Sequence, residues 1–135
     1  MASGFSFWRT LAPHFLSLLR LMAGLLLLEY GTMKILQFPY AEYFANIAPF
    51  SLIWFAGLLE LVGGALVTVG LFTRCAAFVL SGEMAFAYFI GHAPHGFYPA
   101  VNEGVAAALF CFVFLYLSAA GGGPLSLDRI IRRAG

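Results

Sequence analysis

The chain has 135 residues, the length of a single domain, and its composition is strongly apolar. Hydrophobic residues make up 62% of it and charged residues only 10%, whereas soluble domains contain about 25% charged residues. Too few polar side chains remain to cover a soluble globule of this size. The net charge of +1 provides no basic surface, so nucleic acid is not an expected partner. The composition predicts a membrane protein in contact with the lipid bilayer.

Four apolar segments are long enough to cross a bilayer, for which a helix needs about 20 residues. Pro13 suits the first turn of the first helix, where its missing N–H costs nothing. Three consecutive glycines followed by Pro124 end the last predicted helix. We therefore expect an all-α membrane protein, a four-transmembrane-helix bundle that forms one domain over residues 1–135. The predicted spans cover about 13–36, 49–71, 74–91 and 102–119.

The distribution of Lys and Arg predicts how the spans are oriented. With four spans, both termini and the loop between the second and third spans share one side of the membrane. Loops rich in Lys and Arg stay in the cytosol, so both termini are expected there, in the bacterial cytoplasmic (inner) membrane. The tail over 124–135 is predicted to be amphipathic and to lie on the anionic inner leaflet. The residues on this side are Arg9, Arg74, Arg129, Arg132 and Arg133, against Lys34 on the other.

Charged residues within the predicted spans share helix faces with glycines. At about 100° per residue, Arg20, Gly31 and Lys34 lie on one side of the first span. Glu60 shares a side of the second span with two glycines. Because small residues let helices approach closely, we expect these faces to point into the bundle. Glu29 lies opposite Arg20, which leaves it free to meet a second copy in a homo-oligomer or to reach the outer interface.

The rise of about 1.5 Å per residue places the charged residues at two depths. Arg20, Glu60 and Glu83 are predicted to form a buried polar site in the inner half and middle. Ionisable groups inside a membrane are costly and mark sites or proton relays, although ion pairs that only fix helix register are an alternative. One arginine facing two carboxyl groups leaves one carboxyl to hold a proton, as a proton-coupled step requires. The predicted outer gate consists of Lys34, Glu103, His92 and His95.

The histidines and cysteines give no metal or redox motif. His92 and His95 have the spacing of two metal ligands on a helix, but Pro94 between them indicates a loop, and a third ligand is missing. No metal site is expected. Cys75 and Cys111 are far apart and form no C-x-x-C motif, so we interpret them as small buried apolar residues, with a disulfide left open.

Aromatic residues follow one another along the fourth span. They can line a groove for a quinone or a lipid, or they can serve packing and lipid contact, since they cover several faces of the helix. The spacing leaves both interpretations open. These residues are Phe110, Phe112, Phe114 and Tyr116.

Short motifs follow one another along nearly the whole chain. They are Arg20…Gly24…Gly31-x-x-Lys34, Gly57-Leu58-Leu59-Glu60-Leu61-x-Gly63-Gly64, Gly70-Leu71-Phe72-Thr73-Arg74, Glu83-Met84-Ala85-x-Ala87-Tyr88, His95-Gly96-Phe97-Tyr98-Pro99, Asn102-Glu103 and Gly123-Pro124-Leu125-Ser126-Leu127-Asp128. In this order they resemble the DoxX family of small four-helix membrane proteins. The chain departs from the family pattern at Glu29-Tyr30 and at Asn102-Glu103-Gly104.

The resemblance implies a link to membrane redox chemistry. DoxD, a related protein, is a subunit of a thiosulfate–quinone oxidoreductase, and DoxX proteins are similar to partners in thiol-redox complexes. The sequence has no haem-ligand pair and no flavin or nicotinamide motif, so electrons would pass through a bound quinone or a partner protein. The leading hypothesis is a quinone- or thiol-linked redox subunit, and its own catalytic role is left open. The alternatives are a proton-coupled carrier or binder of a small molecule and a non-catalytic assembly partner of another membrane protein.

Overall fold

The computed structural model describes residues 2–134, whose regular structure consists of helices alone. The long helices are α1 (Ala2–Ile35), α2 (Leu52–Val69), α3 (Thr73–Ala87) and α5 (Val105–Ala120). The predicted all-α class is confirmed for this part of the chain. The shorter helices are η1 (Glu42–Phe44), η2 (Tyr88–His92), η3 (Ala93–His95), α4 (Pro99–Asn102) and α6 (Leu127–Ala134).

Three of the predicted spans have the length and composition to cross a membrane. They are Gly4–Ile35, Leu52–Val69 and Thr73–His95. The third continues beyond α3 because η2, a π-helical turn, and η3 extend it. The fourth predicted span corresponds to α5, which is apolar but has only 16 residues. The structure therefore supports a membrane protein with three apolar helices of spanning length and a shorter fourth.

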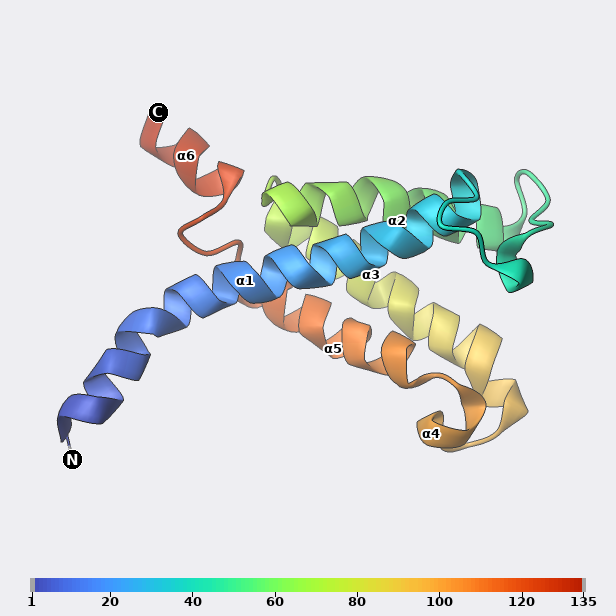
Figure 1. The fold of residues 1–135 in the computed structure, drawn as a ribbon, viewed down its shortest axis with the longest axis horizontal. Coiled ribbons are helices and arrows are strands. Elements are labelled where there is room, and N and C mark those ends of the chain that lie inside the picture. The colour runs from blue at the N-terminus through green and yellow to red at the C-terminus, as the bar shows by residue number, and fades with distance from the viewer. Residues whose placement is uncertain (1, 135) are drawn as a thin grey trace.

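The first helix begins earlier than predicted. We expected a helix start at Pro13, whereas α1 begins at Ala2 and passes through that proline. Proline removes one backbone hydrogen bond and crowds the preceding turn, and Figure 1 shows the first turns of α1 bent away from the rest of the helix. Phe5 and Trp8 are largely exposed on this segment. Exposed aromatic residues of this kind are typical of the interface between lipid and water.

The backbones of α1 and α2 approach each other closely along their glycines (Figure 1). A Cβ at Gly24 would lie 2.6 Å from the backbone nitrogen of Thr68, and a Cβ at Gly64 would lie 2.8 Å from that of Leu28. Side chains do not come this close to a neighbouring backbone. Glycine is thus required at both positions, and the predicted close packing of the glycine-bearing faces is confirmed.

The bundle consists of two helix pairs, α1 with α2 and α3 with α5. Gly70 caps the end of α2, since its φ of 74° lies in the left-handed region that favours glycine, and a short turn leads into α3. Many large apolar side chains remain exposed on the outer faces, Phe86 and Leu109 among them, as lipid contact requires. The buried apolar core between the pairs consists of Ala23, Leu27, Val67, Ala77, Leu80, Met84, Phe114 and Leu117.

The C-terminal helix is attached to the start of α3 by Asp128. The Asp128 carboxylate accepts hydrogen bonds from the backbone nitrogens of Phe72 (2.8 Å) and Thr73 (3.0 Å). Partial burial raises the pKa of Asp128, but these hydrogen bonds and the nearby charge of Arg132 outweigh it and hold the pKa below its usual value. The helix predicted within 124–135 is observed as α6, and its first turn is fixed to the bundle.

Candidate functional site

A buried ion pair joins the two closely packed helices. Lys34 Nζ lies 2.8 Å from both carboxylate oxygens of Glu60. The side chains of Lys34 and Glu60 are only 11% and 2% exposed. Among residues 4–132, whose side chains the structure describes, this is the one salt bridge with an N–O distance within 4.0 Å. Breaking such a pair by removing one partner leaves an uncompensated buried charge.

The local sequence explains why Lys34 reaches Glu60. A Cβ at Gly57, one turn before Glu60, would lie 2.7 Å from Lys34 Cβ. A Cβ at Gly31 would overlap the backbone of α2 at Leu61. The two glycines therefore bring the backbones together on either side of the ion pair.

Two aromatic rings cover the lysine ammonium. Lys34 Nζ lies 5.1 Å from the ring centroid of Phe44 and 5.9 Å from that of Tyr30, within the range of cation–π attraction. Phe44 belongs to η1, in the loop that follows α1. The Gln37 side chain donates a 2.9 Å hydrogen bond to the Phe44 carbonyl oxygen and holds this loop over the pair.

Glu83 brings a second carboxyl group to the pair from α3. Its carboxyl group is a neighbour of the Glu60 carboxylate. Both carboxyl oxygens of Glu83 are buried, and neither has a hydrogen-bond partner. A hydrogen bond between the two groups would need a proton on one of them, because two carboxylates have no donor between them. One lysine and two carboxyl groups thus form what we call the Lys34 cluster: Lys34, Glu60 and Glu83.

Arg20 lies elsewhere, which corrects the predicted grouping of Arg20 with Glu60 and Glu83. Its guanidinium donates hydrogen bonds to the carbonyl oxygens of Gly122 (2.9 Å) and Leu125 (3.0 Å), in the segment between α5 and α6. The prediction considered helix faces and approximate depths. Arg20 and Lys34 share a face, but their 14-residue separation corresponds to about 21 Å along a helix, so only Lys34 reaches the carboxyl groups.

The predicted outer gate does not assemble. Lys34 pairs with Glu60, whereas Glu103 is exposed at a left-handed turn after α4, with φ of 61°. His92 Nδ1 lies 3.0 Å from the backbone oxygen of Asn102, and His95 is exposed. In the described part of the chain, no hydrogen bond or salt bridge joins any two of these four side chains.

The structure also shows the surroundings of Glu29 and of the two cysteines. Glu29 is exposed and stands outside the Lys34 cluster, and the self-interface proposed for it stays a prediction. Cys75 is exposed, which corrects its predicted burial, because it lies in the first turn of α3 on an outer face. Cys111 is half-buried near Ser81, and both thiols are free. Within residues 2–134, no three His, Cys, Asp or Glu side chains group as metal ligands.

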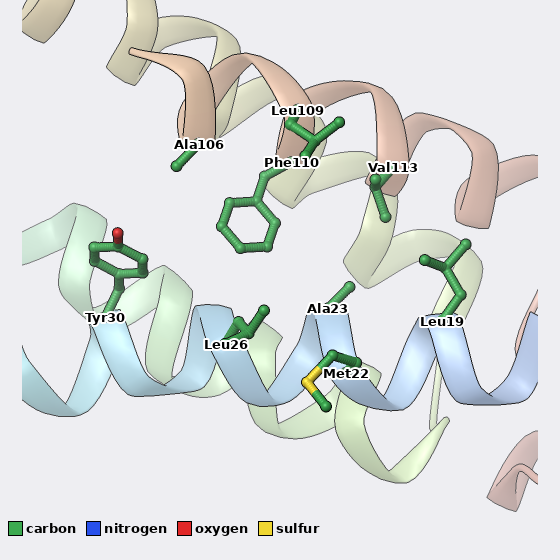
Figure 2. Close-up of a pocket in the computed structure, with 9 residues that line it drawn as sticks. All are labelled: Leu19, Met22, Ala23, Leu26, Tyr30, Ala106, Leu109, Phe110 and Val113. Atoms are coloured by element: carbon green, nitrogen blue, oxygen red, sulfur yellow. The ribbon is translucent and has the colours of Figure 1, made fainter. Parts of the chain in front are cut away.

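An apolar cleft of about 370 Å³ opens between α1 and α5 (Figure 2). Tyr30, whose ring also lies beside Lys34, directs its hydroxyl into this cleft. Phe110 is the one aromatic residue of the fourth predicted span that lines the cleft; Phe114 belongs to the core, and Phe112 and Tyr116 are exposed. No pattern in the sequence indicated that α1 forms the other wall of the cleft. The lining residues are Leu19, Met22, Ala23, Leu26, Tyr30, Ala106, Leu109, Phe110 and Val113.

Comparison with known proteins gives two matches. The sequence model of the DoxX family matches residues 15–93, a range that includes all three residues of the Lys34 cluster. A protein of Haemophilus influenzae, described as an uncharacterized protein, is 43% identical over 122 residues, which cover 86% of this chain and 90% of that protein. No solved structure matches the chain.

Proposed function

This chain belongs to the DoxX family, and on that premise we propose that it is a quinone- or thiol-linked subunit of a membrane redox system. The observation that carries the proposal is the Lys34 cluster, in which one ammonium group faces two buried carboxyl groups. Ionisable side chains at membrane depth are costly and are retained where a protein binds a polar group or moves a proton.

The proposal includes a multi-pass topology with both termini in the cytosol of a bacterium. α5, at about 1.5 Å per residue, is about 24 Å long, somewhat shorter than the hydrocarbon core of about 30 Å, and local thinning of the bilayer accommodates it. The start of α1, the start of α3 and α6, which carry Arg9, Arg74 and Arg129, lie toward the end with the termini, whereas the loops 36–51 and 88–104 at the other end contain no Lys or Arg. This asymmetry supports the proposed orientation.

The residues of the cleft suit a membrane quinone. Its apolar walls match an isoprenoid chain, and its mouth between two helices is open to lipid-soluble molecules. The Tyr30 hydroxyl supplies a hydrogen-bond donor for a quinone oxygen, next to the charged pair. An apolar pocket with a few convergent polar groups is the usual form of a small-molecule site.

The chain's own residues would position the ring and handle protons. In this proposal Lys34 holds Glu60 as a carboxylate, and a proton on the buried, unpartnered Glu83 carboxyl would give it a donor toward Glu60. A bound quinone would accept two electrons from a dithiol of a partner protein, giving a quinol and a disulfide, with two protons taken up by the ring oxygens. Glu83 would then be the proton donor of the Lys34 cluster, and Lys34 would stabilise negative charge on the Glu60 carboxylate.

Reconstitution with quinone and a dithiol reductant tests this proposal. In liposomes that contain the protein and ubiquinone, dithiothreitol should reduce the quinone faster than in protein-free liposomes, as followed by ultraviolet absorbance. Glu83→Gln should lower the protein-dependent rate at least tenfold, because general acid–base catalysis contributes about 10²–10⁴-fold. Glu103→Gln is the matched control and should leave the rate unchanged, since Glu103 is exposed outside the cluster. Equal rates with and without protein would contradict the proposal.

A proton-coupled carrier or binder is the second candidate. The buried Glu83 oxygens without a partner favour it, because a carboxyl that gains and loses a proton during transport must sit where a charge is costly. Proton flux into liposomes without any quinone, abolished by Glu60→Gln, would support this candidate. A function that survives both Glu60→Gln and Arg20→Ala, together with a co-purifying protein, would instead indicate an assembly partner.

A further inference from the structure

The C-terminal helix α6 has one apolar and one charged face. At about 100° per residue, Leu127, Ile130 and Ile131 fall within an arc of about 100°. Asp128, Arg129 and Arg132 fall on the opposite side of the helix. Ile130 and Ile131 are 61% and 57% exposed, so no other described part of the chain covers the apolar face. A helix with this pattern is typical of segments that lie in the plane of a membrane surface.

The start of α6 is held at a fixed place on the bundle. The Ser126 hydroxyl accepts a hydrogen bond from the Arg129 nitrogen, and the Asp128 nitrogen donates a 2.9 Å hydrogen bond to the Gly70 carbonyl oxygen. Together with the Asp128 carboxylate at the start of α3, these contacts attach α6 where α2 passes into α3 (Figure 1). In the proposed topology, this end of the spanning helices lies at the level of the lipid headgroups.

We propose that α6 binds the headgroup region of an anionic phospholipid leaflet. The apolar face would enter the boundary between headgroups and acyl chains, and Arg129 and Arg132, both exposed, would face the phosphates. Charge complementarity favours anionic lipid over a neutral surface, because the Asp128 carboxylate, the one acidic group of α6, is occupied by the backbone of Phe72 and Thr73. α6 therefore presents arginines without a competing free carboxylate.

The arginines determine the size of the expected effect. Each basic side chain near an anionic surface contributes about 1 kcal/mol, or about fivefold in the binding equilibrium. Replacing Arg129 and Arg132 with glutamine should therefore shift the equilibrium between bound and free α6 by about 30-fold. Both side chains are exposed, so the bundle should fold normally in the double variant.

The test places a fluorescent reporter on the apolar face of the full-length protein. Cys75 and Cys111 are first replaced with alanine, Ile131→Cys is introduced, and the thiol is labelled with an environment-sensitive dye. The protein is reconstituted in vesicles of phosphatidylcholine alone or with one quarter phosphatidylglycerol. We expect a blue-shifted emission that lipid-attached quenchers suppress in the anionic vesicles. The shift should be much weaker in the neutral vesicles, and also in anionic vesicles when Arg129→Gln and Arg132→Gln are added.

Three outcomes would overturn the proposal. One is a reporter that water-soluble quenchers reach equally in both kinds of vesicle. Another is equal lipid insertion in both vesicles with and without the arginines, which would indicate anchoring by apolar contact alone. The third is protection that rises with protein density and resists lipid-attached quenchers, which would indicate contact with another protein. High salt screens exposed charges. It should therefore reverse the insertion of α6 into anionic vesicles, and insertion that high salt leaves unchanged would contradict the proposal.

Discussion

Gly57 lies directly against Lys34: a Cβ on this glycine would come 2.7 Å from Lys34 Cβ. The separation between α1 and α2 at the Lys34 cluster therefore depends on a missing methyl group. Helix interfaces in membranes commonly use small residues in this way. Here the close approach lets a lysine on one helix reach a glutamate on the next.

Gly57→Ala should destabilise the bundle by about 1–3 kcal/mol, because the added methyl forces closely packed helices apart. Thermal unfolding in detergent, followed by circular dichroism, measures the change. Gly82→Ala is the matched control, since a Cβ at Gly82 meets nothing within 4 Å. It should leave stability equal or slightly higher, because alanine favours helix over glycine. A similar loss for both variants would show that the close approach at Gly57 is not what matters.

Lys34→Met and Glu60→Gln should each destabilise the protein by about 3–5 kcal/mol, because each leaves a buried charge or acceptor without its partner. The double variant should lose less than the sum of the two, since both halves of the pair are then gone. Denaturation of all four proteins in one detergent gives the coupling energy. Additive losses would contradict a direct ion pair.

Arg20→Lys should loosen the segment between α5 and α6 without affecting the Lys34 cluster. An ammonium group cannot reproduce the two divergent hydrogen bonds that the guanidinium makes to Gly122 and Leu125. Hydrogen exchange read by mass spectrometry should show faster exchange in residues 121–126. Protection around Glu60 should not change. Faster exchange around Glu60 instead would favour the grouping first predicted from the sequence.

Asp128 makes the attachment of α6 sensitive to acid. The pKa of Asp128 is lower in the folded state than in the unfolded state, where it is about 4. Asp128 therefore stabilises the fold at pH values above about 4, and this contribution is lost as pH falls through the lower folded-state pKa. Hydrogen exchange of the Phe72 and Thr73 amides, corrected for the intrinsic rate, should show full protection at neutral pH and loss only below about pH 4. Asp128→Asn should weaken the protection at neutral pH, where the wild-type carboxylate is charged. Loss of protection in the wild type near neutral pH would contradict this account.

The sequence predicted the helical membrane class well because composition and helix length determine it. It also predicted the glycine faces as packing surfaces, which the backbone contacts confirm, and it grouped Glu60 with Glu83 in one polar site. It placed the wrong cation beside them. Helix periodicity gives the face of a side chain, but the partner depends on how two helices slide along each other, which the backbone contact at Gly31 sets.

Two further features, the hydrogen bonds of Asp128 to the start of α3 and the cleft between α1 and α5, could not be predicted from sequence patterns because both depend on how distant segments pack. The role of Asp128 as a cap for α3 joins residues 55 and 56 positions apart, and no local motif indicates such a bond. The cleft between α1 and α5 arises because α1 pairs with α2 and α5 pairs with α3, a choice that equally apolar helices do not reveal.

The infrared spectrum of Glu83 tests the central claim most directly. If Glu83 shares a proton with Glu60 beside Lys34, the protein in lipid at neutral pH should show the C=O stretching band of a protonated carboxyl. That band should disappear in Glu83→Gln and persist in Glu103→Gln, whose parent residue is exposed. A spectrum without the band, or one in which Glu83→Gln leaves it unchanged, would contradict the proposed proton-holding site.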